Sequence, residues 1–338
     1  MVQPAQPSPA QFFDTVNSHT RTAALKAAVD LGLFSAVGEG GATAAELAER
    51  CGAAKRGVRI LSDFLAMLGF LTKADGRYAL TPDSAVFLDR RSPVYLGGAL
   101  EFLLSPTLVG AFDDLAGAVR RGGTMVPEGG TVAPENPVWV RFARGMAPMM
   151  AMPAQELAKL VEIAPGRPAR VLDIAAGHGL FGIAFAQRYP NVEVVALDWP
   201  QVLEVARGNA EAAGVGARHQ LLPGSAFDVE YGGGYDVVLL TNFLHHFDPP
   251  TCEQLLAKVH AALNPGGRAV ALEFVPNEDR ISPPESAGFS LMMLATTPGG
   301  DAYTFAEFDR MFRAAGFARS ESHPLPTTPE QVVIAHKT

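Results

Sequence analysis

Two glycines after a strand-like run of apolar residues could hold a ligand against the backbone. The stretch from Val171 to Gly179 reads Val-Leu-Asp-Ile-Ala-Ala-Gly-His-Gly, and a helix is expected to begin near Leu180. Glycine lets a ligand approach the chain closely, and a helix N-terminus offers free N–H groups. Residues 177–182 also match G-x-G-x-x-G, which occurs in dinucleotide enzymes and by chance. The glycines therefore predict a cofactor site, but they do not choose the cofactor.

Carboxylates at the ends of two successive strands narrow the choice of cofactor. Asp173 stands just before the glycine turn, where it would repel a pyrophosphate and attract a cationic sulfonium ligand that also carries an ammonium group. The next strand ends in Asp198, 19 residues after Gly179, a spacing at which a carboxylate accepts hydrogen bonds from ribose hydroxyls. These residues favour a sulfonium cofactor over a nicotinamide dinucleotide. The plainer interpretation of Asp173, a turn or helix-capping aspartate, stays open.

A third piece lies further along, where Leu263-Asn-Pro-Gly-Gly267 precedes an apolar run that ends in Glu273. Pro-Gly-Gly is typical of a tight turn before a strand. In order and spacing, the three pieces resemble the class I S-adenosylmethionine-dependent methyltransferase domain. Over residues 11–336, the chain resembles a narrower family, the small-molecule O-methyltransferases, which include the plant caffeate and acetylserotonin enzymes and bacterial relatives from antibiotic pathways. The resemblance implies S-adenosylmethionine as the cofactor and S-adenosylhomocysteine as the product.

The resemblance also implies a catalytic base. Residues 242–252 read Asn-Phe-Leu-His-His-Phe-Asp-Pro-Pro-Thr-Cys, similar to the family segment W-x-x-H-D-W-x-D-x-x-C, and His245 falls on the family's base. A neutral imidazole within hydrogen-bond reach can take the proton of a phenol, although a buried histidine with a purely structural hydrogen bond is the plainer interpretation. Glu273 matches one of two glutamates that orient the base in the family. Ala302 stands where the second is expected, and His246 stands where the family has an aspartate.

The cofactor residues that the resemblance implies follow several strands. Ser225 stands where the family has an acidic residue that contacts adenine, and Thr241 stands where it has a lysine. Trp199 could cover the adenine face or simply pack at the strand end. The expected cofactor-binding residues are Asp173, Ala175, Gly177, Gly179, Asp198, Trp199, Gly224, Ser225, Ala226, Phe227, Thr241 and Asn242.

The substrate that receives the methyl group, called the acceptor below, is expected to bind among methionines and aromatic residues. Methionine is polarizable and suits flat aromatic ligands, although helix core is the more common role for such side chains. The expected acceptor-binding residues are Phe142, Met146, Met149, His246, Phe289, Met292, Met293 and Thr296. The resemblance implies methyl transfer to a hydroxyl of a small, aromatic or polyketide-like metabolite. Because Ala302 replaces a glutamate, C-methylation and a non-methylating reaction on the same scaffold are alternatives.

The elements that must position these residues fall into three regions. Residues 11–100 show a helix, turn, helix and hairpin order typical of a winged helix, with a capping box at Thr43 and a turn at Asp75-Gly76. In the family that this chain resembles, such a region forms a swapped homodimer. A DNA-binding regulator is the alternative. The helix near residues 55–68 has basic residues only at its start and is otherwise apolar, which favours dimer packing.

The remaining two regions are expected to build the pockets. Residues 101–165 are predicted to form a helical linker that contributes to the acceptor pocket, with a surface loop at residues 122–137. Residues 166–338 alternate strands and helices, which predicts an α/β, Rossmann-like, doubly wound sheet. Parallel strands are expected at residues 170–174, 193–197, 218–222, 236–241 and 268–273. Two last strands, at 316–319 and 331–336, have no helix between them and predict an antiparallel edge hairpin.

Composition limits the other classes of function. The 338-residue chain carries a formal net charge of −8, which argues against nucleic acid and anionic membranes as partners. Its two cysteines, Cys51 and Cys252, are far apart, so no disulfide framework or metal site is expected, and a reducing cytoplasm is the simplest location. Residues 1–10 are interpreted as a loose tail rather than a signal peptide, and no stretch approaches the roughly 18 apolar residues of a membrane helix. A cytoplasmic homodimer acting on a small molecule is expected.

Overall fold

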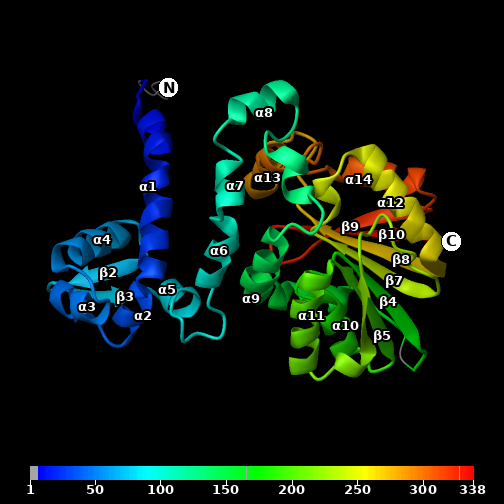
Figure 1. The fold of residues 1–338 in the computed structure, drawn as a ribbon, viewed down its shortest axis with the longest axis horizontal. Helices are drawn as coiled ribbons and strands as arrows, with labels where there is room; N and C mark the ends of the chain where they lie inside the picture. Colours follow the sequence, from blue (N-terminus) through cyan, green and yellow to red (C-terminus); the bar gives the residue numbers. More distant parts are fainter. Residues whose placement is uncertain (1–6, 165, 327) are drawn as a thin grey trace, which may run out of the picture. The chain divides into compact units, whose positions relative to one another are not determined.

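The computed structural model describes residues 7–164, 166–326 and 328–338. The chain divides into two compact units, Met1–Leu100 and Glu101–Thr338, each with an apolar core of its own (Figure 1). The first six residues of the predicted tail lie outside the described part of the chain, and the first helix begins at Ala10.

The N-terminal unit is a small antiparallel sheet, of order β1-β3-β2, with helices packed around one core. Gly32, with a φ of +65°, separates the first two helices, and the predicted capping box is present between Thr43 and Glu46. The order of elements is the predicted winged-helix order. These elements are α1 (Ala10–Asp30), α2 (Leu33–Gly38), β1 (Ala42–Thr43), α3 (Ala44–Arg50), α4 (Lys55–Met67), β2 (Leu71–Ala74), β3 (Arg77–Leu80), α5 (Pro82–Phe87) and η1 (Gly97–Ala99).

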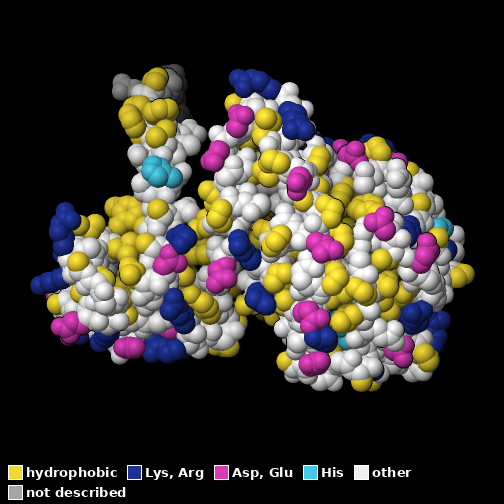
Figure 2. All heavy atoms as spheres, in the orientation of Figure 1, with side chains coloured by type: hydrophobic (Ala, Val, Ile, Leu, Met, Phe, Trp, Pro, Cys, Tyr) yellow, Lys and Arg dark blue, Asp and Glu magenta, His cyan; other side chains and the backbone are white. Residues whose placement is uncertain are grey.

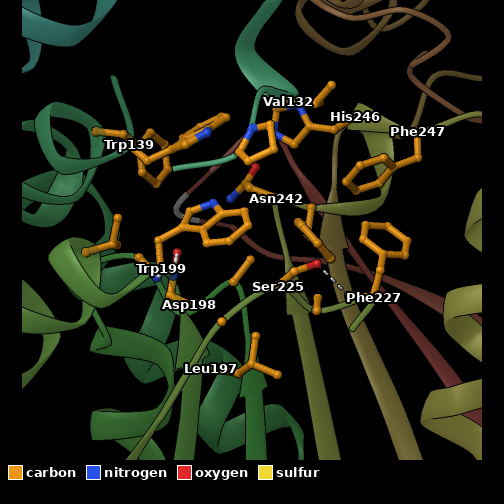
Figure 3. A pocket seen from close by; sticks show the side chains of 18 of the residues that line it. Val132, Trp139, Leu197, Asp198, Trp199, Ser225, Phe227, Asn242, His246 and Phe247 are labelled. Atoms are coloured by element: carbon orange, nitrogen blue, oxygen red, sulfur yellow. Dashed lines mark hydrogen bonds between the residues drawn. The ribbon is translucent and has the colours of Figure 1, made fainter. Parts of the chain in front are cut away.

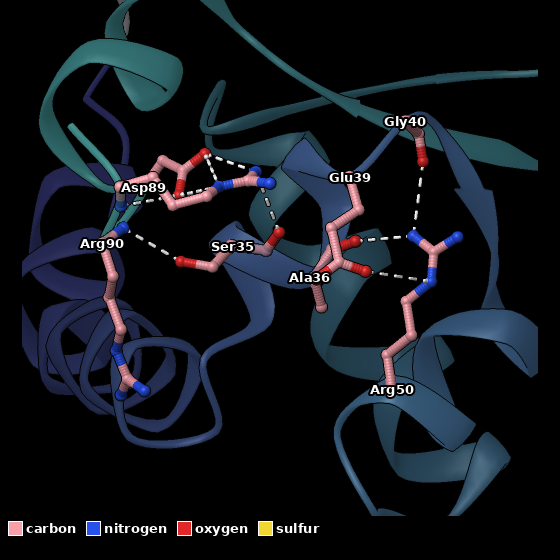
Figure 4. Close-up of polar contacts among 8 residues, drawn as sticks. Ser35, Ala36, Glu39, Gly40, Arg50, Asp89 and Arg90 are labelled. Atoms are coloured by element: carbon pink, nitrogen blue, oxygen red, sulfur yellow. Dashed lines mark hydrogen bonds and ion pairs between the residues drawn. The ribbon is translucent and has the colours of Figure 1, made fainter.

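Polar contacts join three segments of this unit (Figure 4). The Ser35 hydroxyl on α2 accepts a hydrogen bond from the Arg90 N–H at 2.9 Å. The Arg50 guanidinium, at the end of α3, donates to the Ala36 carbonyl at 2.6 Å and to the Gly40 carbonyl at 3.4 Å. These bonds hold both the end of α3 and the segment after α5 against α2.

The C-terminal unit is built on a seven-stranded sheet of order β6-β5-β4-β7-β8-β10-β9. The first five strands of that order run parallel, and β10 runs antiparallel to both of its neighbours. This confirms the predicted doubly wound sheet with an antiparallel hairpin at its edge. The strands are β4 (Ala169–Ile174), β5 (Val192–Asp198), β6 (His219–Pro223), β7 (Tyr235–Thr241), β8 (Leu263–Glu273), β9 (Arg319–Pro324) and β10 (Gln331–His336).

Helices cover both faces of this sheet, since α12 and α14 contribute to one buried core and α9 and α10 to another. The helices before the sheet are α6 (Leu100–Leu103), α7 (Pro106–Gly110), α8 (Leu115–Arg121), η2 (Pro127–Val132) and α9 (Val138–Leu160). Those among the strands are α10 (Leu180–Arg188), α11 (Pro200–Ala212), η3 (Gly216–Arg218), η4 (Leu244–His246), α12 (Pro249–Ala262), α13 (Pro284–Thr296) and α14 (Phe305–Ala314).

Two local predictions are wrong in detail. Pro-Gly-Gly lies inside β8 rather than before it, because β8 begins at Leu263 and its register against β7 shifts beside Tyr235. The hairpin strand predicted from Gly316 begins instead at Arg319. Gly316, with a φ of +99°, follows the end of α14, and Phe317 is buried in the core before the strand begins.

The strand order locates a ligand site. The chain leaves β4 toward β5 on one side, whereas β7 pairs with β4 on the other, and ligands of open α/β sheets bind at the carboxyl ends of the strands at such a point. Ala175 directly follows β4 with a φ of +54°, and Asn242 directly follows β7 with a φ of +53°. Left-handed backbone at a residue other than glycine is strained and is concentrated at functional sites.

Candidate active site

A cavity of about 510 Å³ opens at the carboxyl ends of β4, β5 and β7 (Figure 3). Figure 3 shows Trp199, Ser225 and Asn242 around this cavity, which we call the cofactor cavity. All but two of the expected cofactor residues line this cavity, and the two exceptions are Asp173 and Gly179. The expected residues that line it are Ala175, Gly177, Asp198, Trp199, Gly224, Ser225, Ala226, Phe227, Thr241 and Asn242.

Asp198, the last residue of β5, is held by the glycine turn. One carboxylate oxygen accepts a hydrogen bond from the Gly177 N–H at 2.8 Å, and the other accepts one from the Trp199 N–H at 2.7 Å. Burial raises the pKa of Asp198 to about 6, and these two hydrogen bonds oppose the rise. Gly177 has a φ of +57°, so the backbone conformation that supplies one donor suits glycine. The carboxylate keeps lone pairs that a ligand hydroxyl can use.

Asp173 does not line the cofactor cavity, and its expected contact with the cofactor stays a prediction. Asp173 is fully buried, and its Oδ2 accepts a hydrogen bond at 3.0 Å from the Gly182 N–H in the first turn of α10. Burial raises its pKa to about 7, the bond from Gly182 opposes the rise, and the charge of Asp198 adds to it. Its Oδ1 has no hydrogen-bond partner among the described residues. The geometry agrees with the turn interpretation of Asp173.

Gly179 also lies outside the wall and has a structural reason to be glycine. It precedes α10 with a φ of +74°. A Cβ at this position would lie 2.9 Å from the Ala206 Cβ of α11, closer than carbon atoms tolerate. Gly179 therefore allows α10 and α11 to pack, which shapes the turn without touching the cavity.

A second cavity, of about 200 Å³, lies beside the first and shares Trp139, Phe142, Asn242 and His246 with it. We call it the acceptor cavity. Its wall is mainly apolar and contains every expected acceptor residue: Phe142, Met146, Met149, His246, Phe289, Met292, Met293 and Thr296. His245 lines this cavity and does not line the cofactor cavity. The wall that the cavities share is where a group could pass from one ligand to the other.

Glu273 is the last residue of β8, and His245, in η4, lines the acceptor cavity. Glu273 is fully buried, His245 is 3% exposed, and the His245 Nδ1 is hydrogen-bonded to the Glu273 Oε2. The ring of Phe289 meets the imidazole edge to face, with 4.8 Å between the ring centroids. With Nδ1 donating to a carboxylate, the other ring nitrogen, Nε2, is the acceptor in the neutral imidazole.

His246, the next residue, lines the cofactor cavity (Figure 3) and also the acceptor cavity. Its Nδ1 is buried and has no hydrogen-bond partner among the described residues. Burial holds the pKa of His246 well below its usual value, and the neighbouring His245 lowers it further. His246 is therefore neutral at physiological pH, so it brings no positive charge to the place where a cationic methyl donor would bind.

Comparison with known proteins assigns the chain. Residues 129–318 match the O-methyltransferase domain, and residues 13–90 match the O-methyltransferase dimerisation domain. The chain belongs to the O-methyltransferase family. One relative, the 3-hydroxy-5-methyl-1-naphthoate 3-O-methyltransferase of Streptomyces sahachiroi, is 30% identical over 93% of this chain and 90% of its own length.

The fold of this O-methyltransferase is similar to that of several solved structures. A Nostoc punctiforme protein with a provisional O-methyltransferase assignment is 54% identical, with a TM-score of 0.95 over 98% of this chain and 100% of its own. PigF with S-adenosylhomocysteine is 26% identical, with a TM-score of 0.85 over 98% of this chain and 100% of that one. This chain is therefore an S-adenosylmethionine-dependent O-methyltransferase. Within the described ranges, no helix has both the length and the apolar character needed to cross a membrane.

Part of the wall of both cavities comes from a segment that the sequence analysis assigned to the surface. Residues 131–134 line the cavities, and Thr131 is buried, so the prediction of a surface loop is wrong here. The Thr131 hydroxyl donates to the Thr296 carbonyl at 3.1 Å, and the Trp139 Nε1 donates to the Thr131 carbonyl at 2.9 Å. A Cβ on Gly130 would lie 2.3 Å from the Thr296 carbonyl oxygen. Gly130 thus allows this segment to pack closely against the end of α13.

One charged residue of the acceptor cavity is missing from the predicted set. Glu330, just before β10, lines this cavity and is 3% exposed. Ala302, which stands where the family has a second glutamate, is fully buried and lines neither cavity. Its neighbour Asp301 pairs with Arg280 at 3.2 Å instead. The only sequence signal for Glu330 is a carboxylate directly before an apolar strand.

Proposed function

We propose that this O-methyltransferase methylates a hydroxyl of a small aromatic or polyketide-like metabolite, with His245 as the general base. The observation that carries the proposal is the position of the His245–Glu273 pair. His245 lines an apolar cavity that shares a wall with the cofactor cavity, and Glu273 is hydrogen-bonded to the Nδ1 of its ring. The name of the Streptomyces sahachiroi relative, which describes action on a hydroxylated naphthoate, supports an aromatic acceptor.

The residues of the cofactor cavity fit S-adenosylmethionine. Asp198 offers carboxylate lone pairs to ribose hydroxyls, and the Ser225 oxygen accepts the Phe227 N–H at 3.1 Å, which leaves the Ser225 O–H free to donate. Trp199 and Phe227 add flat apolar surface for the adenine ring of the cofactor. The carboxylates of Asp198 and Asp228 make the wall attractive to a cationic ligand.

The chemical step follows from the two cavities. When bound, S-adenosylmethionine supplies a methyl group that its positive sulfur already activates. The acceptor oxygen forms a bond to the methyl carbon as the carbon–sulfur bond breaks and its electron pair stays on sulfur. The hydroxyl proton passes to His245 Nε2, and Glu273 stabilises the resulting imidazolium. The products are a methyl ether, S-adenosylhomocysteine and a proton that His245 later releases to solvent.

Transfer of a labelled methyl group tests the proposal. The protein is incubated with methyl-labelled S-adenosylmethionine and a panel of phenols, quinols and hydroxylated polyketides, and NMR and mass spectrometry locate the label. The expected result is a methyl ether with one equivalent of S-adenosylhomocysteine. A label on carbon would replace the proposal with C-methylation, and an altered acceptor without any label would point to a non-methylating reaction.

The N-terminal unit supports a homodimer acting on this small molecule. It matches the O-methyltransferase dimerisation domain, and Phe12, Phe13 and Val16 on α1 are each more than half exposed. Figure 2 shows hydrophobic side chains gathered on α1, a surface that a second copy could cover. Light scattering is expected to give the mass of two chains, and F12S/F13S is expected to lower that mass.

The proposal places the enzyme in the cytoplasm and gives it no nucleic-acid partner. Cys51 and Cys252 are free thiols, as a reducing compartment would keep them. In α4, Arg59 is paired with Asp63 at 3.0 Å, which leaves fewer basic groups for a phosphate backbone. A salt-sensitive shift of duplex DNA at modest protein concentration would contradict this part of the proposal.

A further inference from the structure

Glu330 brings a carboxylate to the wall of the acceptor cavity, which Glu273 does not line. It directly precedes β10, and the first residue of β10, Gln331, pairs with Glu273 at the end of β8. The antiparallel pairing therefore brings Glu330 to the edge of the sheet that carries the His245–Glu273 pair. Glu330 and His245 both line the acceptor cavity, so both side chains are within reach of a ligand there.

The Glu330 side chain is held in place but not saturated. The Thr328 hydroxyl donates to its Oε2, and the Asn242 amide also forms a hydrogen bond with it. The preceding carbonyl, of Pro329, accepts the Ser286 hydroxyl of α13 at 3.4 Å, which fixes the backbone. A carboxylate has about four acceptor positions. Two donors therefore leave Glu330 able to accept a further hydrogen bond.

Several other polar groups at this end of the cavity already have partners, although the His246 Nδ1 does not have one among the described residues. Glu273 uses Oε1 for two backbone N–H groups and Oε2 for His245. The hydroxyls of Thr131 and Thr296 donate to backbone carbonyls, at 3.1 and 2.7 Å. Since Glu273 already fixes the His245 ring at Nδ1, a second carboxylate is not needed for that purpose. Besides its bond from Thr328, Glu330 is available to a ligand in this cavity.

Burial makes Glu330 favour a ligand with a hydrogen-bond donor. Burial raises the pKa of Glu330, the hydrogen bonds from Thr328 and Asn242 oppose the rise, and the charge of Glu273 adds to it while that of His245 opposes it. An ionised carboxylate in an apolar cavity is unfavourable unless its lone pairs are satisfied. A ligand that supplies a donor relieves this penalty, and a ligand without one displaces water and leaves the carboxylate unsatisfied.

We infer that Glu330 determines which methyl acceptors bind. Its carboxylate accepts a hydrogen bond from a second polar group of the substrate. The preferred acceptor then carries a hydroxyl or amino group besides the hydroxyl that is methylated. The inference rests on the proposed function, because it takes the acceptor to occupy this cavity. A site built to bind such a donor discriminates strongly against the analogue that lacks it.

Matched naphthols test the inference by direct binding. Isothermal titration calorimetry measures the affinity of the protein, loaded with S-adenosylhomocysteine, for 2,3-dihydroxynaphthalene against 2-naphthol and for 1,8-dihydroxynaphthalene against 1-naphthol. The wild type is expected to bind at least one diol about 10- to 100-fold more tightly than the matched naphthol, which has a single hydroxyl. A hydrogen bond to a charged group implies a ratio of this size. Glu330→Gln is expected to reduce this ratio about tenfold, and Glu330→Ala is expected to abolish it.

Controls separate this role from folding and from catalysis. Glu285→Gln removes an exposed carboxylate from α13 and is expected to keep the wild-type ratio. Affinity for S-adenosylhomocysteine is expected to stay unchanged in the Glu330 variants, because Glu330 does not line the cofactor cavity. Equal wild-type affinity within both pairs would overturn the inference, as would a preference that survives Glu330→Ala. A shift in the pH profile of 2-naphthol methylation in Glu330→Gln would assign Glu330 to proton transfer instead.

Methyl transfer to the same compounds is measured in parallel. A Glu330-dependent preference in binding, without any methylation, would contradict the proposed function and support the role of Glu330 as a donor-binding residue. Methylation of both members of each pair at equal rates and affinities would support the proposed function and overturn the role of Glu330.

Discussion

Glu273 binds the His245 ring through one carboxylate oxygen and the backbone of the same turn through the other. Its Oε2 is hydrogen-bonded to the His245 Nδ1, and its Oε1 accepts the N–H groups of Phe243 at 2.9 Å and Leu244 at 2.8 Å. The ring and the turn are thus fixed by one buried side chain. This arrangement links proton transfer to the local fold, and the two can be separated by substitution.

Replacing His245 removes the proposed base while leaving the cofactor cavity intact. His245→Gln is expected to lower kcat about 100- to 10,000-fold, the usual contribution of a positioned acid or base. Affinity for S-adenosylhomocysteine is expected to stay near the wild-type value, because His245 does not line that cavity. Steady-state kinetics and calorimetry measure both. His323→Ala, on β9, is the control, and near-full turnover by His245→Gln would instead favour methylation by proximity alone.

Two substitutions at Glu273 are expected to differ in their effects, one mainly on kcat and the other on stability. Glu273→Gln keeps an acceptor for the backbone N–H groups but loses the charge that stabilises the imidazolium, so kcat is expected to fall about 10- to 100-fold with little change in Tm. Glu273→Ala leaves two buried N–H groups unpaired and is expected to lower the free energy of unfolding by about 1–3 kcal/mol. Thermal melts and kinetics on both variants check this. Equal losses of Tm in the two variants would show that Glu273 is purely structural.

The sequence predicted most of the site because parallel strands bring their carboxyl ends to one edge. Asp198 and Asn242 are reached by following this rule along β5 and β7. The same rule brings Asp173 to this edge, near the end of β4. The sequence shows that it lies near the end of β4 but not that its side chain points under α10, where the Gly182 N–H binds it. Strand position and side-chain direction are separate quantities, since neighbouring side chains alternate faces.

Contacts between distant segments were beyond the reach of the sequence. The bond from Thr131 to the Thr296 carbonyl joins residues 165 positions apart, and it turns a Gly/Pro-rich stretch into a cavity wall. Glu330 is brought to the cavity that His245 lines by the antiparallel pairing of β10 with β8. Local pattern predicts the hairpin, but it does not reveal that the hairpin delivers a carboxylate to the acceptor cavity.

Asp173 is expected to make the fold pH-dependent. Its pKa is raised from 3.8 to about 7, chiefly by burial, so its contribution to stability is complete below about pH 4 and is lost as pH rises through about 7. Asp173→Asn keeps an acceptor for the Gly182 N–H and removes this loss. The variant is therefore expected to gain stability over the wild type as pH rises, on the order of a few kcal/mol at pH 8.

Thermal melts from pH 4 to pH 8 follow this difference for Asp173→Asn, and calorimetry with S-adenosylhomocysteine at neutral pH serves as the second readout. Unchanged affinity is expected, because Asp173 does not line the cofactor cavity. A large loss of affinity with a flat stability difference would support the direct ligand role that the sequence suggested.

Asp198 is expected to make the affinity for the cofactor pH-dependent, whereas Asp173 is expected to affect the stability of the fold. Its pKa is raised to about 6, chiefly by burial, so the carboxylate that can accept from ribose hydroxyls forms as pH rises through about 6. Affinity for S-adenosylhomocysteine is expected to increase between about pH 5 and pH 7 in the wild type. Asp198→Asn is expected to bind about tenfold or more weakly at pH 7 and to lose most of this pH dependence. Asp279→Asn, an exposed carboxylate, is expected to behave as wild type. If Asp198→Asn bound as tightly as the wild type at pH 7, its carboxylate would serve only to hold the Gly177 turn, and another group would have to bind the ribose.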